Sequence, residues 1–470
     1  MSGLAWLDGQ PFSPRYGDVY FSRESGLAET RHVFLHGNRL EARFAALSPR
    51  AAFTIAETGF GTGLNLRCAW QAWREHAPQG ARLDYVSVEK HPLDARELAQ
   101  TLALWPQLAP LAAKLLARYH ALTPGWNRLD CEDGVRLTLL VGDALESLAQ
   151  ARFLADAWFL DGFSPARNHA MWQPALFHAM ARLCAPGASF ATFTSAGAVR
   201  RGLGEAGFAV EKIKGFGKKR DMLAGRLAAP PQAPWNPPWY ANPAVPGATR
   251  AIVVGGGIAG AASAHALARR GLAVTLVERH AALAQEGSGN SQGILYAKLS
   301  PHAPPLSRLT LAGYGHTLRL LRALSLSADD ASFCGVLQLA PDETHARRQA
   351  ALAERLGELV RVLDSAQASR LAGMPLPAGG LCFPDAGWIH PPAAVRALAT
   401  SAGIGVRQAN VTGIAWDEGE WRVFAAAGEV ARAPVLVLAT AGATLAFPPA
   451  AHLPLQRNRG QISVLPATPQ

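Results

Sequence analysis

The chain has 470 residues, of which 49% are hydrophobic and 17% charged, and its 45 Lys and Arg outnumber 35 Asp and Glu to give a formal net charge of +10. This composition excludes a disordered chain, and the length predicts two or three domains, each with its own core. The positive charge favours a polyanionic partner such as nucleic acid, although a general bias toward Arg and Ala would also produce it.

No apolar run is long enough for a membrane span and no secretory signal opens the chain, so we expect a cytoplasmic protein. Five cysteines are scattered without a C-x-x-C pair, which argues against a disulfide frame or a zinc site and suits a reducing compartment. The 14 histidines show no ligand spacing, and no metal is expected.

The first half of the chain alternates between short apolar runs, which predict strands, and longer amphipathic stretches, which predict helices. Strands are expected at 52–56, 85–88, 137–141, 157–160 and 189–194, and helices at 64–76, in stretches up to residue 120, and at 172–183. Alternation of this kind predicts a parallel sheet that is covered by helices on both faces.

A glycine-rich turn follows the first of these strands and opens the first helix. Its spacing E-x-G-x-G-x-G is formed by Glu57, Gly59, Gly61 and Gly63. Glycine lets the backbone turn tightly and pass close to a ligand. Glu89 ends the next strand, where it can accept both ribose hydroxyls of a nucleoside, and Asp143 follows a later strand, where it can reach an adenine edge. Together they predict an S-adenosylmethionine site, with a structural turn and ordinary surface acids as the alternative.

The segment 158–165 ends an apolar strand on Asp161 and then turns through Gly162. Open α/β sheets bind ligands at the carboxyl ends of their strands, so we expect Asp161 to meet the group that accepts the methyl. A carboxylate orients an amine by accepting its N–H bonds, but at an ordinary pKa of about 3.9 it is a poor base for an alkylammonium. Asp161 is therefore expected to orient the amine while water takes the proton. A helix N-cap is the alternative role.

The densest basic cluster surrounds Phe216. It consists of Lys212, Lys214, Lys218, Lys219 and Arg220. Lys and Arg contact RNA phosphates, and an aromatic ring can stack on a base. We expect Lys214, Lys218, Lys219 and Arg220 to bind RNA, with a solvated strand end as the alternative.

Seven prolines between residues 230 and 246 predict an extended linker, because proline blocks helices and sheet ladders. Beyond it, expected strands at 251–254 and 274–277 flank an expected helix at 257–270. Gly255, Gly257 and Gly260 have the G-x-G-x-x-G spacing of a dinucleotide-binding turn, and Glu278 lies at the end of the next expected strand. A pyrophosphate would lie at the helix N-terminus and the acid on the ribose, which disfavours NADP and leaves FAD or NAD.

Several segments of the first half resemble the MnmC family of bacterial tRNA wobble-uridine modification enzymes. They are DVYFS at 18–22, ETRHVF at 29–34, GFGTGLN at 59–65, DAWFLDGFSPARN at 156–168, ATFTSAG at 191–197 and KGFGKKR at 214–220. The resemblance implies a domain that uses S-adenosylmethionine to methylate 5-aminomethyl-2-thiouridine to 5-methylaminomethyl-2-thiouridine in tRNA. It also implies a flavoprotein domain that first removes the carboxymethyl group from 5-carboxymethylaminomethyl-2-thiouridine.

The second half resembles FAD-dependent oxidoreductases of the D-amino-acid-oxidase type. The loop 287–293 with Gly289 resembles their flavin-approaching loop, and 435–442, which ends at Gly442, resembles their strand and turn beside the cofactor. Arg459, Gly460 and Gln461 resemble the strand that opens the second half of their substrate domain. Members of this family continue to a closing segment over the flavin, whereas this sequence ends at Gln470, so we expect an incomplete FAD domain with little or no oxidase activity.

The expected fold is therefore α/β. We expect a Rossmann-like class I methyltransferase domain at 1–228, a Pro-rich linker at 229–249 and an incomplete FAD-binding Rossmann domain of the D-amino-acid-oxidase type at 250–470. The expected function is tRNA modification with S-adenosylmethionine and FAD as cofactors. Two other functions stay open, namely a soluble FAD-dependent amine oxidase with an accessory first domain and a non-catalytic tRNA-binding scaffold.

Overall fold

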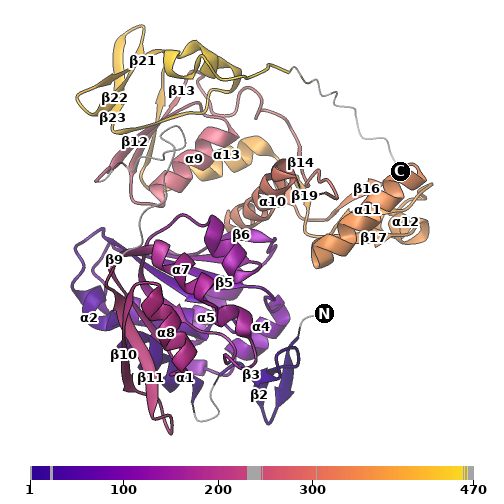
Figure 1. The fold of residues 1–470 in the computed structure, drawn as a ribbon. Helices are drawn as coiled ribbons and strands as arrows, with labels where there is room; N and C mark the ends of the chain where they lie inside the picture. Colours follow the sequence, from indigo (N-terminus) through magenta and orange to yellow (C-terminus); the bar gives the residue numbers. More distant parts are fainter. Residues whose placement is uncertain are drawn as a thin grey trace. The chain divides into compact units, whose positions relative to one another are not determined.

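The computed structural model describes residues 3–21, 25–229, 245, 247–302, 304–458, 460 and 463. These residues form two compact units (Figure 1). The first contains the described residues up to 229 together with 308–319, and the second contains the other described residues. Residues 308–319 belong to one long helix, α10 (Pro305–Ala323). The expected division of the chain assigns them to the second domain, whereas here they group with the first unit. Most of the expected linker at 229–249, and both Arg459 and Gln461, lie outside the described residues.

The first unit is built on an eight-stranded sheet with the order β10-β11-β9-β8-β4-β5-β7-β6. Its strands are β4 (Ala52–Thr58), β5 (Arg82–Glu89), β6 (Gly125–Glu132), β7 (Val135–Val141), β8 (Ala155–Leu160), β9 (Cys184–Thr192), β10 (Phe208–Lys214) and β11 (Asp221–Leu227). The five central strands are parallel, as predicted. The other three strands, β10 and β11 on one side and β6 on the other, pair antiparallel and are not predicted by the sequence pattern. Short turns at 133–134 and 215–220 join β6 to β7 and β10 to β11, and a connection that short requires an antiparallel pair.

Helices cover both faces of this sheet. They are α1 (Gly26–Thr30), the π-helix η1 (Arg31–His36), α2 (Leu40–Ala45), α3 (Leu64–His76), α4 (Ala95–Leu102), η2 (Pro106–Leu108), α5 (Ala109–Leu116), α6 (Ala144–Gln150), η3 (His169–Trp172), α7 (Pro174–Arg182) and α8 (Gly197–Glu205). Successive strand residues enter opposite cores, with Tyr85 and Phe159 in one and Val86 and Trp158 in the other. Burial on both faces explains why these strands are continuous apolar runs rather than alternating ones.

A small antiparallel sheet precedes the large one. Its strands are β1 (Ala5–Leu7), β2 (Gln10–Ser13) and β3 (Asp18–Val19). The turn between β2 and β3 carries residues 14–17, and this turn reaches the site described below.

The second unit contains a four-stranded parallel sheet with the order β20-β13-β12-β24. Its strands are β12 (Arg250–Val254), β13 (Ala273–Glu278), β20 (Ile404–Gln408) and β24 (Val435–Leu438), and the helices packed on it include α9 (Ile258–Ala268) and α13 (Pro391–Ala399). The predicted strand, helix and strand at 251–277 are therefore confirmed as β12, α9 and β13. Both units are α/β, as expected.

Three further antiparallel sheets belong to the second unit. They are formed by β14 (Gly293–Leu295), β19 (Gly387–Ile389) and β15 (Ala331–Ser332); by β16 (Val336–Leu339), β18 (Gly380–Phe383) and β17 (Arg361–Leu363); and by β21 (Val411–Asp417), β22 (Glu420–Ala425) and β23 (Gly428–Ala433). The other helical segments are α11 (Glu343–Leu356), η5 (Gly357–Leu359), α12 (Ser365–Ala372), η6 (Ala441–Ala446) and η7 (Pro448–Ala450).

Candidate active site

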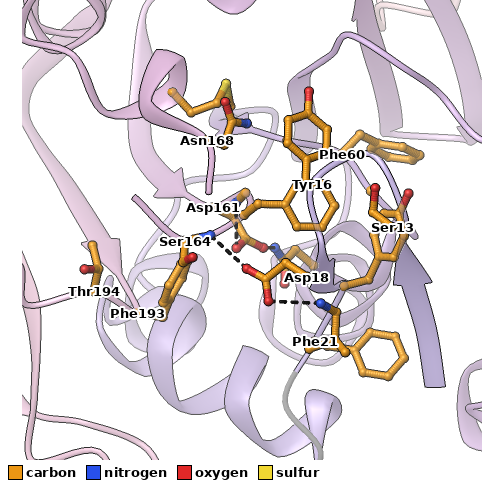
Figure 2. A pocket seen from close by; sticks show the side chains of 18 of the residues that line it. Ser13, Tyr16, Asp18, Phe21, Phe60, Asp161, Ser164, Asn168, Phe193 and Thr194 are labelled. Carbon is orange, nitrogen blue, oxygen red and sulfur yellow. Dashed lines mark hydrogen bonds between the residues drawn. The ribbon is translucent and has the colours of Figure 1, made fainter. Parts of the chain in front are cut away.

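A cavity of about 720 Å³ lies in the first unit, at the carboxyl ends of the central strands (Figure 2). It sits where the strand order changes direction, because β4 pairs with β5 on one side and with β8 on the other. Ligands of open α/β sheets bind at such a switch point. Seven of the residues expected from the sequence line this cavity: Gly59, Gly61, Glu89, Asp143, Asp161, Lys219 and Arg220.

The glycine-rich turn between β4 and α3 forms the floor of the cavity. Gly59 and Gly61 have φ values of 85° and 52°, in the left-handed region that favours glycine. A Cβ on Gly61 would lie 3.3 Å from the Tyr20 ring, and a Cβ on Gly59 would lie 3.2 Å from the Gly162 Cα. These glycines therefore keep open a space that a side chain would fill, as a closely bound cofactor requires.

Glu89 ends β5 and is tied to this turn. Its Oε2 accepts from the Gly61 N–H at 3.0 Å and its Oε1 accepts from the His91 N–H at 2.8 Å. Burial raises the pKa of this carboxyl, while the backbone N–H groups oppose that rise. Each oxygen retains a lone pair, so Glu89 can also accept hydrogen bonds from ligand hydroxyls.

Asp143 follows β7 and is the N-cap of α6. Its Oδ1 accepts from the Leu145 and Glu146 N–H groups at 3.1 and 3.4 Å, and its Oδ2 lies 3.1 Å from Lys90 Nζ. Partial burial would raise the pKa of Asp143, but Lys90 and the helix N–H groups together lower it below its ordinary value. A carboxylate that stays ionised on the cavity wall can accept hydrogen bonds from an adenine amino group.

Asp161 lies directly after β8, at the inner end of the cavity. Its Oδ2 accepts from Asn65 Nδ2 at 2.6 Å and its Oδ1 accepts from the Gly162 N–H at 2.8 Å. The Thr58 hydroxyl donates to the Asp161 carbonyl at 2.9 Å and so fixes this residue to β4. No helix begins at Asp161 in the described part of the chain, so it is not an N-cap; Asp143 is one instead.

The acidity expected of Asp161 requires correction. Burial raises its pKa to about 7, although hydrogen bonds from Gly162 and Asn65 and the nearby Lys219 charge oppose that rise. The expectation that it is too acidic to take the amine proton rested on an ordinary carboxyl pKa. A carboxylate with a pKa of about 7 is a far better proton acceptor than one near 3.9.

Glu57 and Gly63 do not line the cavity, contrary to the direct cofactor contact expected for them. The Glu57 side chain lies beneath the turn and is only 1% exposed. Its Oε1 accepts from Asn65 Nδ2 at 2.9 Å and its Oε2 accepts from the Ser87 hydroxyl at 2.6 Å. Glu57 therefore makes no direct contact with the cavity, and its hydrogen bond to Asn65 connects it to a residue that does.

The N-terminal sheet supplies a wall of the cavity that the sequence pattern does not predict. The Tyr16 and Phe163 rings stack with centroids 4.5 Å apart, and the Tyr20 ring meets Phe163 edge-on at 5.3 Å. Asp18 Oδ2 accepts from the Ser164 N–H at 3.2 Å, and Figure 2 shows this bond beside Asp161. In the sequence this wall is indicated only by the family resemblance of the segment 18–22. Its strand β3 has two residues, which is too short to show the alternation of polar and apolar residues that predicts a strand.

The basic cluster is divided between the cavity and the surface. Lys219 and Arg220 line the cavity, whereas Lys214 and Lys218 do not. Lys219 Nζ lies 2.8 Å from Glu29 Oε1 and 5.0 Å from the centroid of the Phe193 ring. Lys219 is thus an ion-pair partner in this structure, and its expected contact with an RNA phosphate stays a prediction. Lys214, Lys218 and Arg220 are exposed.

In the second unit the dinucleotide-type turn lies between β12 and α9. A Cβ on Gly255 would lie 2.4 Å from the Ala439 carbonyl oxygen, and one on Gly260 would lie 1.7 Å from the Gly255 oxygen. Glu278 Oε2 accepts from the Gly256 N–H at 2.6 Å. The glycines let the backbone turn closely before the N-terminus of α9, where a pyrophosphate group can bind to helix N–H groups. The residues present therefore fit FAD.

The other residues expected near a flavin lie in two loops. Gly257 begins α9 at its N-cap, and the Ile258 N–H donates to Ser288 Oγ at 2.9 Å, which brings the loop of Gly289 to the same turn. Gly442 lies in η6 after β24, where its carbonyl accepts from Arg457 Nη2 at 2.9 Å.

No group of three or more His, Cys, Asp or Glu side chains among the described residues is placed to hold a metal ion. None of the helices described has the length and apolar character needed to cross a membrane.

Comparison with known proteins identifies both halves. Residues 106–228 match a family model described as S-adenosyl-L-methionine-dependent methyltransferase, and residues 250–470 match one described as FAD dependent oxidoreductase. A solved structure of MNMC2 from Aquifex aeolicus is 22% identical with a TM-score of 0.38, over 50% of this chain and 72% of that one.

The curated relatives are far more similar. The tRNA 5-methylaminomethyl-2-thiouridine biosynthesis bifunctional protein MnmC of Pseudomonas paraeruginosa is 57% identical over 99% of this chain and 72% of its own length. The protein of the same name from Chromobacterium violaceum is 56% identical with the same coverage. The chain therefore belongs to the MnmC family of bifunctional tRNA 5-methylaminomethyl-2-thiouridine biosynthesis proteins.

Proposed function

We propose that the first unit transfers a methyl group from S-adenosylmethionine to the primary amine of 5-aminomethyl-2-thiouridine at the wobble position of tRNA. The observation that carries this proposal is the placement of Asp161, an amine-binding group, in the same cavity as the nucleoside-binding acids Glu89 and Asp143. Donor and acceptor groups must meet at one point, and this cavity brings their expected partners together.

Gly59, Gly61, Glu89 and Asp143 would hold S-adenosylmethionine, which supplies a methyl group on a positively charged sulfur. Glu89 would accept the ribose hydroxyls and Asp143 the adenine amino group. The open space above Gly59 and Gly61 would admit the methionine moiety, because a side chain at either position would occupy it. Glu57 and Gly63 support this arrangement from outside the cavity.

Asp161 would accept N–H bonds from the amine through the lone pairs that Asn65 and Gly162 leave free. The amine nitrogen forms its bond to the methyl carbon as the carbon–sulfur bond breaks, and it loses one proton. With a pKa raised to about 7 by burial, Asp161 can take that proton and pass it to water.

RNA would reach the cavity across three exposed basic residues, Lys214 at the end of β10 and Lys218 and Arg220 in the β10–β11 turn, with Lys219 at the rim. Phosphate contacts of this kind position RNA without reading its sequence. The wobble base would leave its stack to enter the cavity, where Tyr16 and Phe163 offer aromatic faces for stacking. Because the substrate is tRNA, the protein would act in the cytoplasm.

The second unit would bind FAD through Gly255, Gly257, Gly260 and Glu278, with Gly289 and Gly442 in the loops beside the flavin. FAD supplies a two-electron acceptor for oxidation of a CH–NH bond, the chemistry that removes a carboxymethyl group from the precursor amine. We assign 1–228 to the methyltransferase, 229–249 to the linker and 250–470 to the oxidoreductase. The product of the second unit would be the amine substrate of the first.

Incubation of the full chain with bulk tRNA and labelled S-adenosylmethionine tests this proposal. Label in 5-methylaminomethyl-2-thiouridine is expected after digestion to nucleosides. tRNA binding without label would instead support the scaffold alternative. Oxidation of small amines with neither binding nor label would support the amine oxidase.

A further inference from the structure

Asn65, in the first turn of α3, lies between two buried carboxyl groups. Its Nδ2 donates to Asp161 Oδ2 at 2.6 Å and to Glu57 Oε1 at 2.9 Å, and its Oδ1 accepts from the Thr30 hydroxyl at 2.9 Å. The side chain is 7% exposed and faces the cavity. One amide thus connects the β4 acid, the β8 acid and the N-terminal helix.

We propose that Asn65 is a positioning residue that keeps a single negative charge in this group, on Asp161, while Glu57 is a neutral acid. This inference rests on the proposed function, because it assigns how the amine-binding carboxylate is held. In this role Asn65 and Glu57 act through Asp161 and do not touch the substrate.

The hydrogen bonds leave little freedom in this group. The Thr30 hydroxyl donates to Asn65 Oδ1, which directs both amide N–H bonds toward the two acids. Each Asp161 oxygen then has one protein donor, Asn65 or Gly162, and its remaining lone pair is available to the cavity. Asn65 therefore determines the rotation of the Asp161 carboxylate that an amine would meet.

The distances and burial indicate which acid is charged. The bond from Asn65 to Asp161 is shorter than the bond to Glu57, as a charged acceptor favours. Glu57 is 1% exposed, whereas Asp161 borders the cavity. An ionised carboxylate loses more stabilisation at the more buried position, and two ionised carboxylates on one amide would repel each other.

A neutral Glu57 has a partner for its proton. The Ser87 hydroxyl lies 2.6 Å from Glu57 Oε2, and a contact between a hydroxyl and a protonated carboxyl can run in either direction. Burial raises the pKa of Glu57 to about 8, which agrees with the neutral form.

Other titratable groups also face Asp161. They are Glu57 on β4, Tyr85 on β5, Glu29 on α1 and Lys219 in the β10–β11 turn. Glu29 and Lys219 pair with each other, and burial keeps the pKa of Tyr85 well above its ordinary value. Asp161 and Glu57 are therefore the side chains in this cluster that we expect to gain or lose a proton near neutral pH.

The test measures the pH profile of methyl transfer by the full chain carrying Asn65→Leu, Asn65→Asp or Glu57→Gln. Asn65→Leu should lower kcat by ~10-fold or more. Asn65→Asp should move the rising limb of the profile upward by about one pH unit, because it adds a carboxyl next to Asp161. Glu57→Gln should leave the midpoint of that limb in place, whatever its effect on rate. A shifted midpoint in Glu57→Gln would show that Glu57 carries the charge and would overturn the proposal.

Asn127→Leu serves as the matched control, because Asn127 is a buried asparagine of β6 whose hydrogen bonds go to Thr123, Gly125 and Leu139, none of which lines the cavity. It should lower Tm without moving the pH profile. If Asn65→Leu behaves like this control, Asn65 is merely structural and the proposal fails.

The pH dependence of Tm separates this proposal from the proposed function, since it needs no RNA. The unfolded Glu57 titrates near an ordinary pKa of about 4.3 and the folded one at about 8. The raised folded pKa stabilises the protein below the unfolded value, and this stabilisation is lost as pH rises through about 8. Glu57→Gln should therefore flatten the fall of Tm across this range. An unchanged slope would contradict a neutral Glu57 even if the chain methylates tRNA.

Discussion

Glu89 and Glu278 make the same pair of backbone contacts in their separate units. Oε2 of each accepts from a glycine N–H of the turn after the preceding strand, at 3.0 Å from Gly61 and 2.6 Å from Gly256. Oε1 of each accepts from the N–H two residues further on, at 2.8 Å from His91 and 2.9 Å from His280. Each acid thus shapes the turn that would carry its cofactor, in addition to offering lone pairs to a ribose.

Gly61→Val should weaken S-adenosylmethionine binding. Gly61 has a φ of 52°, and a Cβ there would lie 3.3 Å from the Tyr20 ring and enter the cavity. Calorimetry should show affinity reduced by ~10-fold or more. Gly80→Val is the control, because Gly80 has a similar φ of 82° but its nearest neighbour is 3.8 Å away, on Arg50. Equal losses in both variants would mean that backbone strain, not occupancy of the cavity, is responsible.

Asp161→Asn should lower methyl transfer by ~10²-fold or more while S-adenosylmethionine affinity is retained. In the wild type, kcat/KM should rise with pH through about 7, because burial raises the pKa of Asp161 to about 7 and only the ionised form accepts a proton. Asp156→Asn, at the opposite end of the same strand, should keep both rate and profile. Wild-type turnover in Asp161→Asn would remove Asp161 from the chemistry.

Lys218→Ala combined with Arg220→Ala should weaken tRNA binding and reduce the slope of log K against log salt by about 1.4 to 2. Lys219 is left intact because it pairs with Glu29, so its replacement would both remove a positive charge and leave Glu29 without this partner. Arg152→Ala provides the control, since this exposed residue precedes the amino end of β8, whereas the cavity lies at the carboxyl end. A salt slope equal to that of the control would place the RNA surface elsewhere.

Gly260→Ala should lower the affinity for FAD by ~10-fold or more, because its Cβ would lie 1.7 Å from the Gly255 oxygen and force the turn apart. The control is Gly405→Ala in β20, where the nearest atom to a Cβ is the Val274 oxygen at 4.0 Å. Flavin fluorescence on titration measures both. Unchanged affinity in Gly260→Ala would exclude this turn as the FAD site.

The local parts of the fold are readable from the sequence because their signals are local. The turn at 57–63 lies between an apolar run and a helical period, and the structure has β4 and α3 there. The two edge strands β6 and β10 carry polar residues on exposed faces and so lack the apolar runs of the buried strands. The strands of the N-terminal sheet are too short for any period.

The site is less readable because its decisive contacts are long-range. Asn65 and Asp161 lie 96 positions apart, and no spacing rule connects them. The pKa of Asp161 is raised chiefly by its burial in the folded chain, so an ordinary value is the natural but wrong expectation from the sequence. Glu57 resembles a ligand in its motif, yet its side chain points beneath the turn.

The central claim is that the chain methylates a primary amine on the wobble uridine, and one comparison tests it most directly. Two anticodon stem-loops, one with 5-aminomethyl-2-thiouridine and one with 5-carboxymethylaminomethyl-2-thiouridine, are incubated with the full chain and S-adenosylmethionine, and their nucleosides are analysed by mass spectrometry. The account predicts that the first RNA gains one methyl group on its amine nitrogen and that the second gains one only after its carboxymethyl group has been removed, so its nitrogen never carries both groups. Methylation of the ring, the ribose or neither RNA would contradict it.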